Sequence, residues 1–348
     1  MTLPLQEPKK DKMRNAKLLP FLLLILLGSC KTDPKPEIEV PNPVWSTVYS
    51  QDSVLWFSLG FSDALNGLIS GARIDQGGYL RGNVLMKTSN SGQSWDEVPT
   101  ADFPVFTDIV FLDSNIGLAT GQNSIFRTIN GGSNWVKVFE HEGVSPEAIS
   151  FADQNNGLVT GLFGLVLKTT DGGLHWNLKP SGYHCHLADV DMTDSNTAYV
   201  AGYMNQTDHL YGAILITHDG GISWDSISTG QVMCNSLSFP SKNAGYVFGA
   251  TLSGSVLLRT SDAGITWETS IQSSFAGTNA TSFIDAPRGF SVGQNGRIIR
   301  TIDYGQNWES MQSNTNAYLG RIRMIDFNNG YAIGLDDGSM KGVVLRYR

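Results

Sequence analysis

The sequence predicts an all-β fold, a seven-bladed β-propeller with four antiparallel strands per blade, on three observations. A nine-residue segment that ends in Trp recurs six times, at intervals of 40 to 48 residues. Such a period is typical of one supersecondary unit repeated in an array. A second motif, of Gly, three mainly apolar residues and Gly, recurs between these segments. From residue 44 onward apolar and polar residues alternate without a helical period, which indicates strands.

Each repeat contains four predicted strands. The first is an alternating run such as 107–115, the second is the Gly motif, the third ends in a basic residue followed by Thr, and the fourth starts at the Trp. Four strands in about 43 residues are typical of a propeller blade. The Gly motif has seven copies, the fourth with Ala in the first position: 67–71, 117–121, 157–161, 198–202, 245–249, 289–293 and 330–334.

The two ends of this region predict how the ring closes. The chain stops at residue 348, after the third strand of the seventh repeat, and residues 44–48 resemble the fourth strand of another repeat, 134–138. We therefore expect residues 44–49 to complete the blade formed by residues 319–348. This pairing would remove the open sheet edges that an unclosed array exposes.

The recurrent nine-residue segment resembles the Asp-box, or BNR repeat, with the pattern S/T-x-D-x-G-x-x-W. A short carboxylate or amide can accept hydrogen bonds from its own turn, and a Trp ring can fill the space between blades. Because each acid lies on a different blade, we interpret them as structural rather than as a catalytic or metal site. The acidic or amide positions are Asn90, Asn130, Asp171, Asp219, Asp262 and Asp303. The Trp positions are Trp95, Trp135, Trp176, Trp224, Trp267 and Trp308.

A basic residue occupies the same position on the third strand of six blades, with Ile216 as the exception; Thr follows it in five of them and Tyr347 follows it in the last. One interpretation is a set of solvated side chains that pair with nearby acids. The other is a ring of positive charge that forms a docking surface. The residues are Lys87, Arg127, Lys168, Arg259, Arg300 and Arg346.

Residues 1–29 predict a lipoprotein signal peptide, starting at Met1 or Met13. The apolar run 18–27 is too short to span a bilayer, and the sequence Leu-Gly-Ser-Cys that ends at Cys30 is similar to a bacterial lipobox. Cys30 is then the lipid attachment site. Residues 30–43 hold four Pro and predict a tether of about 40 Å at roughly 3 Å per residue. The expected location is the bacterial cell envelope, with the membrane and leaflet left open.

Charge and cysteine content limit the partners. Removing residues 1–29 takes away five basic and two acidic residues, which changes the net charge from −8 to −11. Such a charge repels phosphate backbones, so we expect no nucleic-acid partner. Cys185 and Cys234 remain in an oxidising compartment, and whether they form a disulfide is left open. We expect a monomer without a cofactor.

The loops between the second and third strands share one face with those between blades, opposite the Asp-box turns. Segments 72–83 and 203–213 are longest there, and 182–191 lies beside them. Loops of this kind often bind ligands. Candidate binding residues are Tyr183, His184, His186, Asp191 and His209. The histidines and Cys185 are a weak zinc signal because no second spaced ligand pair accompanies them.

A glycoside hydrolase is the alternative function. Alternation places Asp108, Asp189 and Asp191 toward the central channel, and that reaction needs two acids roughly 5–9 Å apart. Sialidases also carry Asp-boxes, but they hold the substrate carboxylate with three arginines and have an Arg-Ile-Pro motif. Here Arg321 and Arg323 lie on an inner strand and Arg-Ile-Pro is absent.

The Gly motif, followed by a basic residue, Thr and the Asp-box, resembles the photosystem II stability and assembly factor family over residues 44–348. This resemblance implies a lipid-anchored, non-catalytic assembly chaperone, and the family's basic third-strand positions match those given above. Nothing in the chain points to a photosynthetic partner. We therefore expect a lipid-anchored propeller that binds a protein or, alternatively, a glycan, without catalysing a reaction.

Overall fold

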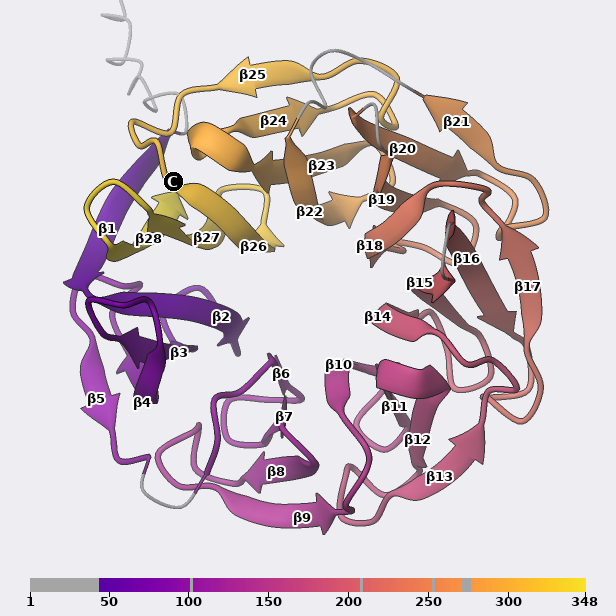
Figure 1. The fold of residues 1–348 in the computed structure, drawn as a ribbon, viewed down its shortest axis with the longest axis horizontal. Helices are drawn as coiled ribbons and strands as arrows, with labels where there is room; N and C mark the ends of the chain where they lie inside the picture. The colour runs from indigo at the N-terminus through magenta and orange to yellow at the C-terminus, as the bar shows by residue number, and fades with distance from the viewer. Residues whose placement is uncertain (1–43, 101–102, 207–208, 252–253, 271–276) are drawn as a thin grey trace, which may run out of the picture. The chain divides into compact units, whose positions relative to one another are not determined.

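The computed structural model describes residues 44–348 apart from four gaps, at 101–102, 207–208, 252–253 and 271–276. In this part of the chain, seven four-stranded antiparallel sheets follow one another around a ring (Figure 1). The predicted seven-bladed β-propeller is therefore confirmed. The predicted signal peptide, the lipid attachment site Cys30 and the tether lie outside the described residues.

The first four blades each use four consecutive strands. Blade 1 contains β2 (Val54–Phe61), β3 (Gly67–Ile74), β4 (Leu80–Thr88) and β5 (Asp96–Val98). Blade 2 contains β6 (Asp108–Phe111), β7 (Gly117–Gly121), β8 (Ser124–Thr128) and β9 (Val136–Glu140). Blade 3 contains β10 (Pro146–Phe151), β11 (Gly157–Gly161), the short turn η1 (Leu162–Gly164), β12 (Leu165–Thr169) and β13 (Asn177–Pro180). Blade 4 contains β14 (His186–Met192), β15 (Ala198–Gln206), β16 (His209–Thr217) and β17 (Asp225–Ser228).

Two further blades follow the same order, and the last one differs. Blade 5 contains β18 (Met233–Ser238), β19 (Gly245–Thr251), β20 (Gly254–Thr260) and β21 (Glu268–Ser270). Blade 6 contains β22 (Thr278–Asp285), β23 (Arg288–Gly293), the turn η3 (Gln294–Gly296), β24 (Ile298–Thr301) and β25 (Glu309–Met311). Blade 7 contains β26 (Tyr318–Asp326), β27 (Asn329–Asp336), β28 (Lys341–Tyr347) and, as its outer strand, β1 (Trp45–Asp52).

The pairing of β1 with β28 closes the ring, as predicted. Trp45 lies opposite Tyr347 and Ser46 lies opposite Arg346 in this antiparallel pair. The Trp45 side chain is 1% exposed, and its ring lies 5.2 Å from that of Tyr347 and 5.9 Å from that of Phe290 on blade 6. The terminal strand is thus held by an aromatic anchor as well as by its hydrogen bonds.

The first Gly of the Gly motif lies against a Phe ring in five of the seven blades. A Cβ atom at Gly245 would lie 2.2 Å from the ring of Phe239, and one at Gly67 would lie 2.3 Å from the ring of Phe61. The Phe at the end of the first strand therefore lies directly over the start of the second. It also stacks on the preceding blade, since the rings of Phe61 and Tyr331 are 3.9 Å apart. Close packing of this kind leaves no room for a side chain.

The recurrent turns are held by their own side chains. In blade 5 the Thr260 hydroxyl donates to Asp262 and accepts the Gly264 N–H, while Asp262 accepts the Thr266 N–H at 2.9 Å. The other five turns repeat the bond from Thr to the acid or amide. The Trp rings that follow are buried at Trp95 and Trp176 and partly buried at Trp135, Trp224, Trp267 and Trp308.

Candidate functional site

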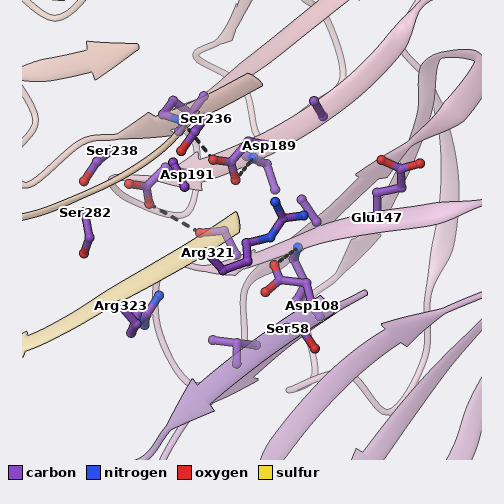
Figure 2. Close-up of a pocket in the computed structure, with 18 of the residues that line it drawn as sticks. Ser58, Asp108, Glu147, Asp189, Asp191, Ser236, Ser238, Ser282, Arg321 and Arg323 are labelled. Atoms are coloured by element: carbon purple, nitrogen blue, oxygen red, sulfur yellow. Dashed lines mark hydrogen bonds between the residues drawn. The ribbon is translucent and has the colours of Figure 1, made fainter. Parts of the chain in front are cut away.

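The innermost strand of each blade lines a central channel. Side chains from β2, β6, β10, β14, β18, β22 and β26 surround a cavity of about 260 Å³. Most of the side chains that line it are polar, and Figure 2 shows Asp108, Glu147, Asp189, Asp191, Arg321 and Arg323 among them. The inner-strand alternation therefore predicted the acids and arginines of the channel correctly, but it did not predict Glu147.

The channel carboxylates join neighbouring blades. Asp108 on β6 accepts the N–H of Ile149 on β10 at 3.0 Å. Asp189 on β14 accepts the N–H of Leu237 on β18 at 2.8 Å. Asp191, two residues further along, accepts the N–H of Phe239 at 2.8 Å. Each carboxylate thus satisfies a backbone donor that the next inner strand leaves unpaired.

Serine does the same work at other blade boundaries. Ser150, Ser238 and Ser282 accept the backbone N–H groups of Met192, Phe283 and Met324 on the following inner strands. The acids therefore occupy positions at which a neutral acceptor also closes the joint between blades. A structural role therefore explains the hydrogen bonds of Asp189 and Asp191, and no catalytic role is needed to explain them.

Burial changes the protonation of these acids. It raises the pKa of Asp189 from 3.8 to about 7, with the Leu237 N–H opposing the rise and the Asp108 carboxylate adding to it. Burial likewise raises the pKa of Asp191 to about 6, against the Phe239 N–H and the Arg323 charge. It also raises the pKa of Asp108. Loss of water around a carboxylate disfavours its charged form.

The two arginines lie on the same side of β26, with the buried Ile322 between them facing the other way. Arg321 reaches into the space between Asp189 and Asp108 (Figure 2), and its charge lowers the pKa of both acids. Arg323 lowers the pKa of Asp191 in the same manner. Among the described residues, Arg323 makes no hydrogen bond and no ion pair.

The mouth of the channel at blades 3 and 4 carries the predicted histidines. His186 Nε2 lies 2.5 Å from Glu147 Oε2, and its ring meets Tyr203 edge-on at 4.8 Å. His184 is exposed, whereas Tyr183 is partly buried. The side chain of His209 lies outside the described residues. Within the described part of the chain, no three His, Cys, Asp or Glu side chains gather as a metal site would require.

The two cysteines do not form a disulfide. Cys185 and Cys234 are both free and buried. Burial raises the pKa of each thiol to about 11, although the Thr229 hydroxyl opposes this slightly at Cys234. Both residues therefore belong to the apolar packing between blades, where Cys185 and Leu187 share one cluster.

Most of the basic third-strand residues contact the next blade. The Nζ of Lys168 donates to the carbonyl of Gly220 at 2.7 Å, and the Nε of Arg127 donates to that of Gly172 at 3.0 Å. Lys87, Arg259 and Arg300 reach Ser133, Tyr304 and Tyr347 in the same way. The predicted pairing with acids occurs at two of them, as Arg259 with Glu268 and Arg300 with Glu309.

Arg346 differs from the others in this set. It bonds to Asn329 in its own blade at 3.3 Å and is only 8% exposed. At the gap in the pattern, Ile216 is buried and packs in the cluster shared by blades 4 and 5. Most of the basic ring is thus engaged in contacts that hold the propeller together.

Comparison with known proteins gives a match in fold. No family model and no curated protein matches the chain. The structure of YCF48 bound to D1 peptide is 16% identical, with a TM-score of 0.66, and the match covers 87% of this chain and 96% of that one. YCF48 from Cyanidioschyzon merolae is 15% identical, with a TM-score of 0.67, and covers 88% and 98%. The structure of U3-55K is 8% identical, with a TM-score of 0.67, and covers 87% and 98%.

These similarities concern architecture. The two YCF48 structures confirm, in fold, the resemblance to photosystem II assembly-factor propellers that the motifs indicate. U3-55K matches as well at half the identity, so the fold does not by itself select a partner. Among the described residues, no helix is long and apolar enough to cross a bilayer. The chain is similar to YCF48 as a seven-bladed propeller.

Proposed function

We propose that this protein is a non-catalytic, lipid-anchored propeller that binds a protein partner in the bacterial cell envelope and acts as an assembly scaffold. The observation that carries the proposal is a group of three exposed apolar side chains, two of them aromatic, on the face of the ring opposite the Asp-box turns. The Asp-box turns also expose apolar side chains, such as Ile222 and Ile265, but most of these are aliphatic. Tyr79 is 68% exposed, Leu80 is 54% exposed and Phe163 is 75% exposed. All three lie at turns between the second and third strands of their blades, on the face opposite the Asp-box turns.

The loop that carries Tyr79 is an ordered projection. Arg81 forms an ion pair with Asp75 at 2.7 Å, and its guanidinium lies 5.8 Å from the centre of the Tyr79 ring. An aromatic side chain held in this way loses little entropy on binding, and aromatic residues often dominate protein interfaces. Phe163 has a positive φ of 59°, which turns it outward at the tip of η1.

Two further observations support a role without catalysis. The channel carboxylates are engaged with backbone amides of the next blade, as their serine counterparts are. The similar propeller YCF48 has been solved with a D1 peptide bound, which supports a peptide or protein ligand for this fold. The lipid anchor rests on the Leu-Gly-Ser-Cys sequence that ends at Cys30 and on the Pro-rich segment after it.

The test uses crosslinking and mass spectrometry on intact cells that express the full chain. The double variant Tyr79→Ala with Phe163→Ala should reduce recovery of the partner about tenfold or more, since interface aromatics contribute about 2 kcal/mol or more each. The matched control is Ile265→Ala, which removes an 82% exposed apolar side chain from an Asp-box turn on the opposite face. Equal recovery of the partner with the double variant and with the Ile265→Ala control would refute the proposal that the partner docks on this face.

A glycoside hydrolase at the channel mouth is the second candidate. The raised pKa of Asp189, about 7, and that of Asp191, about 6, favour it, since glycosidases use a carboxyl group that stays protonated near neutral pH. Turnover of sialosides or plant glycans by the propeller, lost in Asp191→Asn, would establish this function. Binding without turnover would instead indicate a lectin-like role.

A further inference from the structure

The channel has two chemically different sides. Carboxylates come from three consecutive blades, with Asp108 on blade 2, Glu147 on blade 3, and Asp189 and Asp191 on blade 4. Hydrogen-bond donors come from the next three: Ser236 and Ser238 on blade 5, Ser282 on blade 6, and Arg321 and Arg323 on blade 7. We name these the acidic wall and the donor wall. Figure 2 shows members of both walls around the cavity.

The donor wall has unused hydrogen-bonding capacity. Ser238 and Ser282 accept a backbone N–H from the next blade through Oγ, which leaves the hydroxyl protons without an acceptor among the described residues. Arg323 beside them makes no hydrogen bond or ion pair in that part of the chain, although it lies in a cavity. A guanidinium flanked by hydroxyl groups is a good partner for a carboxylate.

The acidic wall disfavours a plain anion. Asp189 accepts the N–H groups of Val190 and Leu237, one on each oxygen, and both acids line the cavity. Asp191 accepts the Phe239 N–H on one oxygen and the Ser150 hydroxyl on the other. A carboxylate oxygen has two lone pairs, so each oxygen can accept one more hydrogen bond. An ammonium group is the natural partner for such carboxylates. Arg321 and Arg323 in turn disfavour a plain cation. The cavity therefore matches a ligand that carries both charges, because either charge alone meets repulsion from one wall.

We propose that the channel binds a small zwitterion of the α-amino-acid class. Its carboxylate lies against Arg323, Ser282 and Ser238, and its ammonium group lies against Asp191 and Asp189. A cavity of about 260 Å³ is large enough for a molecule of this size. This site is separate from the exposed tips at Tyr79 and Phe163, so it goes beyond the docking function.

The test measures binding of the common L-amino acids, one at a time at millimolar concentration, by calorimetry and by thermal shift at pH 8. We expect at least one to bind. Its deaminated analogue, which keeps only the carboxylate, and its decarboxylated analogue, which keeps only the amine, should each bind about tenfold more weakly. Absence of binding by every amino acid, or equal binding by either analogue, would overturn the proposal.

Two variants locate the site. Arg323→Gln should abolish binding. The ligand-free variant should still fold, with at most a small decrease in melting temperature, because Arg323 makes no hydrogen bond or ion pair in the described structure and acts on Asp191 only through its charge. Arg73→Gln, which breaks a surface ion pair with Glu97, is the matched control and should bind normally. Asp191→Asn keeps an acceptor for the Phe239 N–H. It should nevertheless weaken binding of the amino acid and strengthen binding of its deaminated analogue. Unchanged affinities in Arg323→Gln would place any bound amino acid elsewhere.

Discussion

Replacing Asp189 with Asn should remove part of the pH dependence of stability. In the folded protein, burial holds the pKa of Asp189 near 7, whereas an exposed Asp titrates near 3.8. Between these values the folded state keeps a proton that the unfolded state has lost. Stability from this residue is therefore fully present below about pH 4 and is lost as the pH rises through about 7. Above that pH the contribution is constant.

The size of the effect follows from the two pKa values. Their difference corresponds to about 4 kcal/mol at 1.36 kcal/mol per pH unit. Asp189 is partly exposed where it lines the channel, and solvent screens a partly exposed charge, so we expect about 2 kcal/mol in practice. For a propeller of this length, 2 kcal/mol changes the melting temperature by about 3 °C. Asn keeps an oxygen for the Leu237 N–H, so the joint between blades survives the substitution.

The assay compares the melting temperatures of the parent and its variants from pH 2 to pH 8. Relative to the parent, Asp189→Asn should become more stable by about 3 °C across this range. Asp171→Asn is the control of opposite sign, because the His175 N–H lowers the pKa of that acid to about 2. It should lose stability relative to the parent as the pH rises from 2 to 5. A difference between Asp189→Asn and the parent that is the same at every pH would refute the reasoning.

Three further outcomes can be checked on the same protein. Cys185 and Cys234 should react with a chromogenic thiol reagent only after unfolding, because both are buried and the pKa of each is about 11; rapid labelling of the native protein would contradict this. Trp45→Ala should cost about 3 kcal/mol or more by denaturant unfolding, since it removes the anchor of the closing strand. Gly245→Ala should cost about 1–3 kcal/mol, because the new methyl group meets the Phe239 ring; an unchanged midpoint would show that the ring can move.

The contacts of the basic residues on the third strands could not be predicted from the sequence pattern. Their recurrence is visible in the sequence, and both interpretations, pairing with acids or docking, assumed side chains that face solvent. The structure instead places the donors of Lys87, Arg127 and Lys168 on groups of the next blade. Substituting Arg259 and Arg300 would therefore disturb ion pairs and contacts between blades, in addition to any effect on a partner.

Glu147 was not predictable from alternation. The pairing of β10 with β11 shifts register between Pro146 and Ala148, so Glu147 lies at an irregularity in the strand. At such a position the inward and outward alternation breaks. By contrast, Asp108, Asp191 and Arg323 lie in regular pairs of their strands, whereas Asp189 and Arg321 directly follow register shifts. All five are residues with a paired partner on the next strand, and the alternation placed all five in the channel.

By itself the sequence determined the ring: seven repeats, four strands in each, and the closing of the last blade by residues near 44. The strands and the turn of each blade follow from the short-range spacing of Gly, Thr, Asp and Trp within one repeat. The number of blades follows from how often that spacing recurs along the chain. Only the tertiary structure decided what the charged side chains do. Their partners are mainly backbone amides and carbonyls 41 to 52 residues away on the next blade. Every residue other than Pro has the same backbone amide and carbonyl, so the sequence does not mark which of them a charged side chain will contact. Those partners are set only when neighbouring blades pack together.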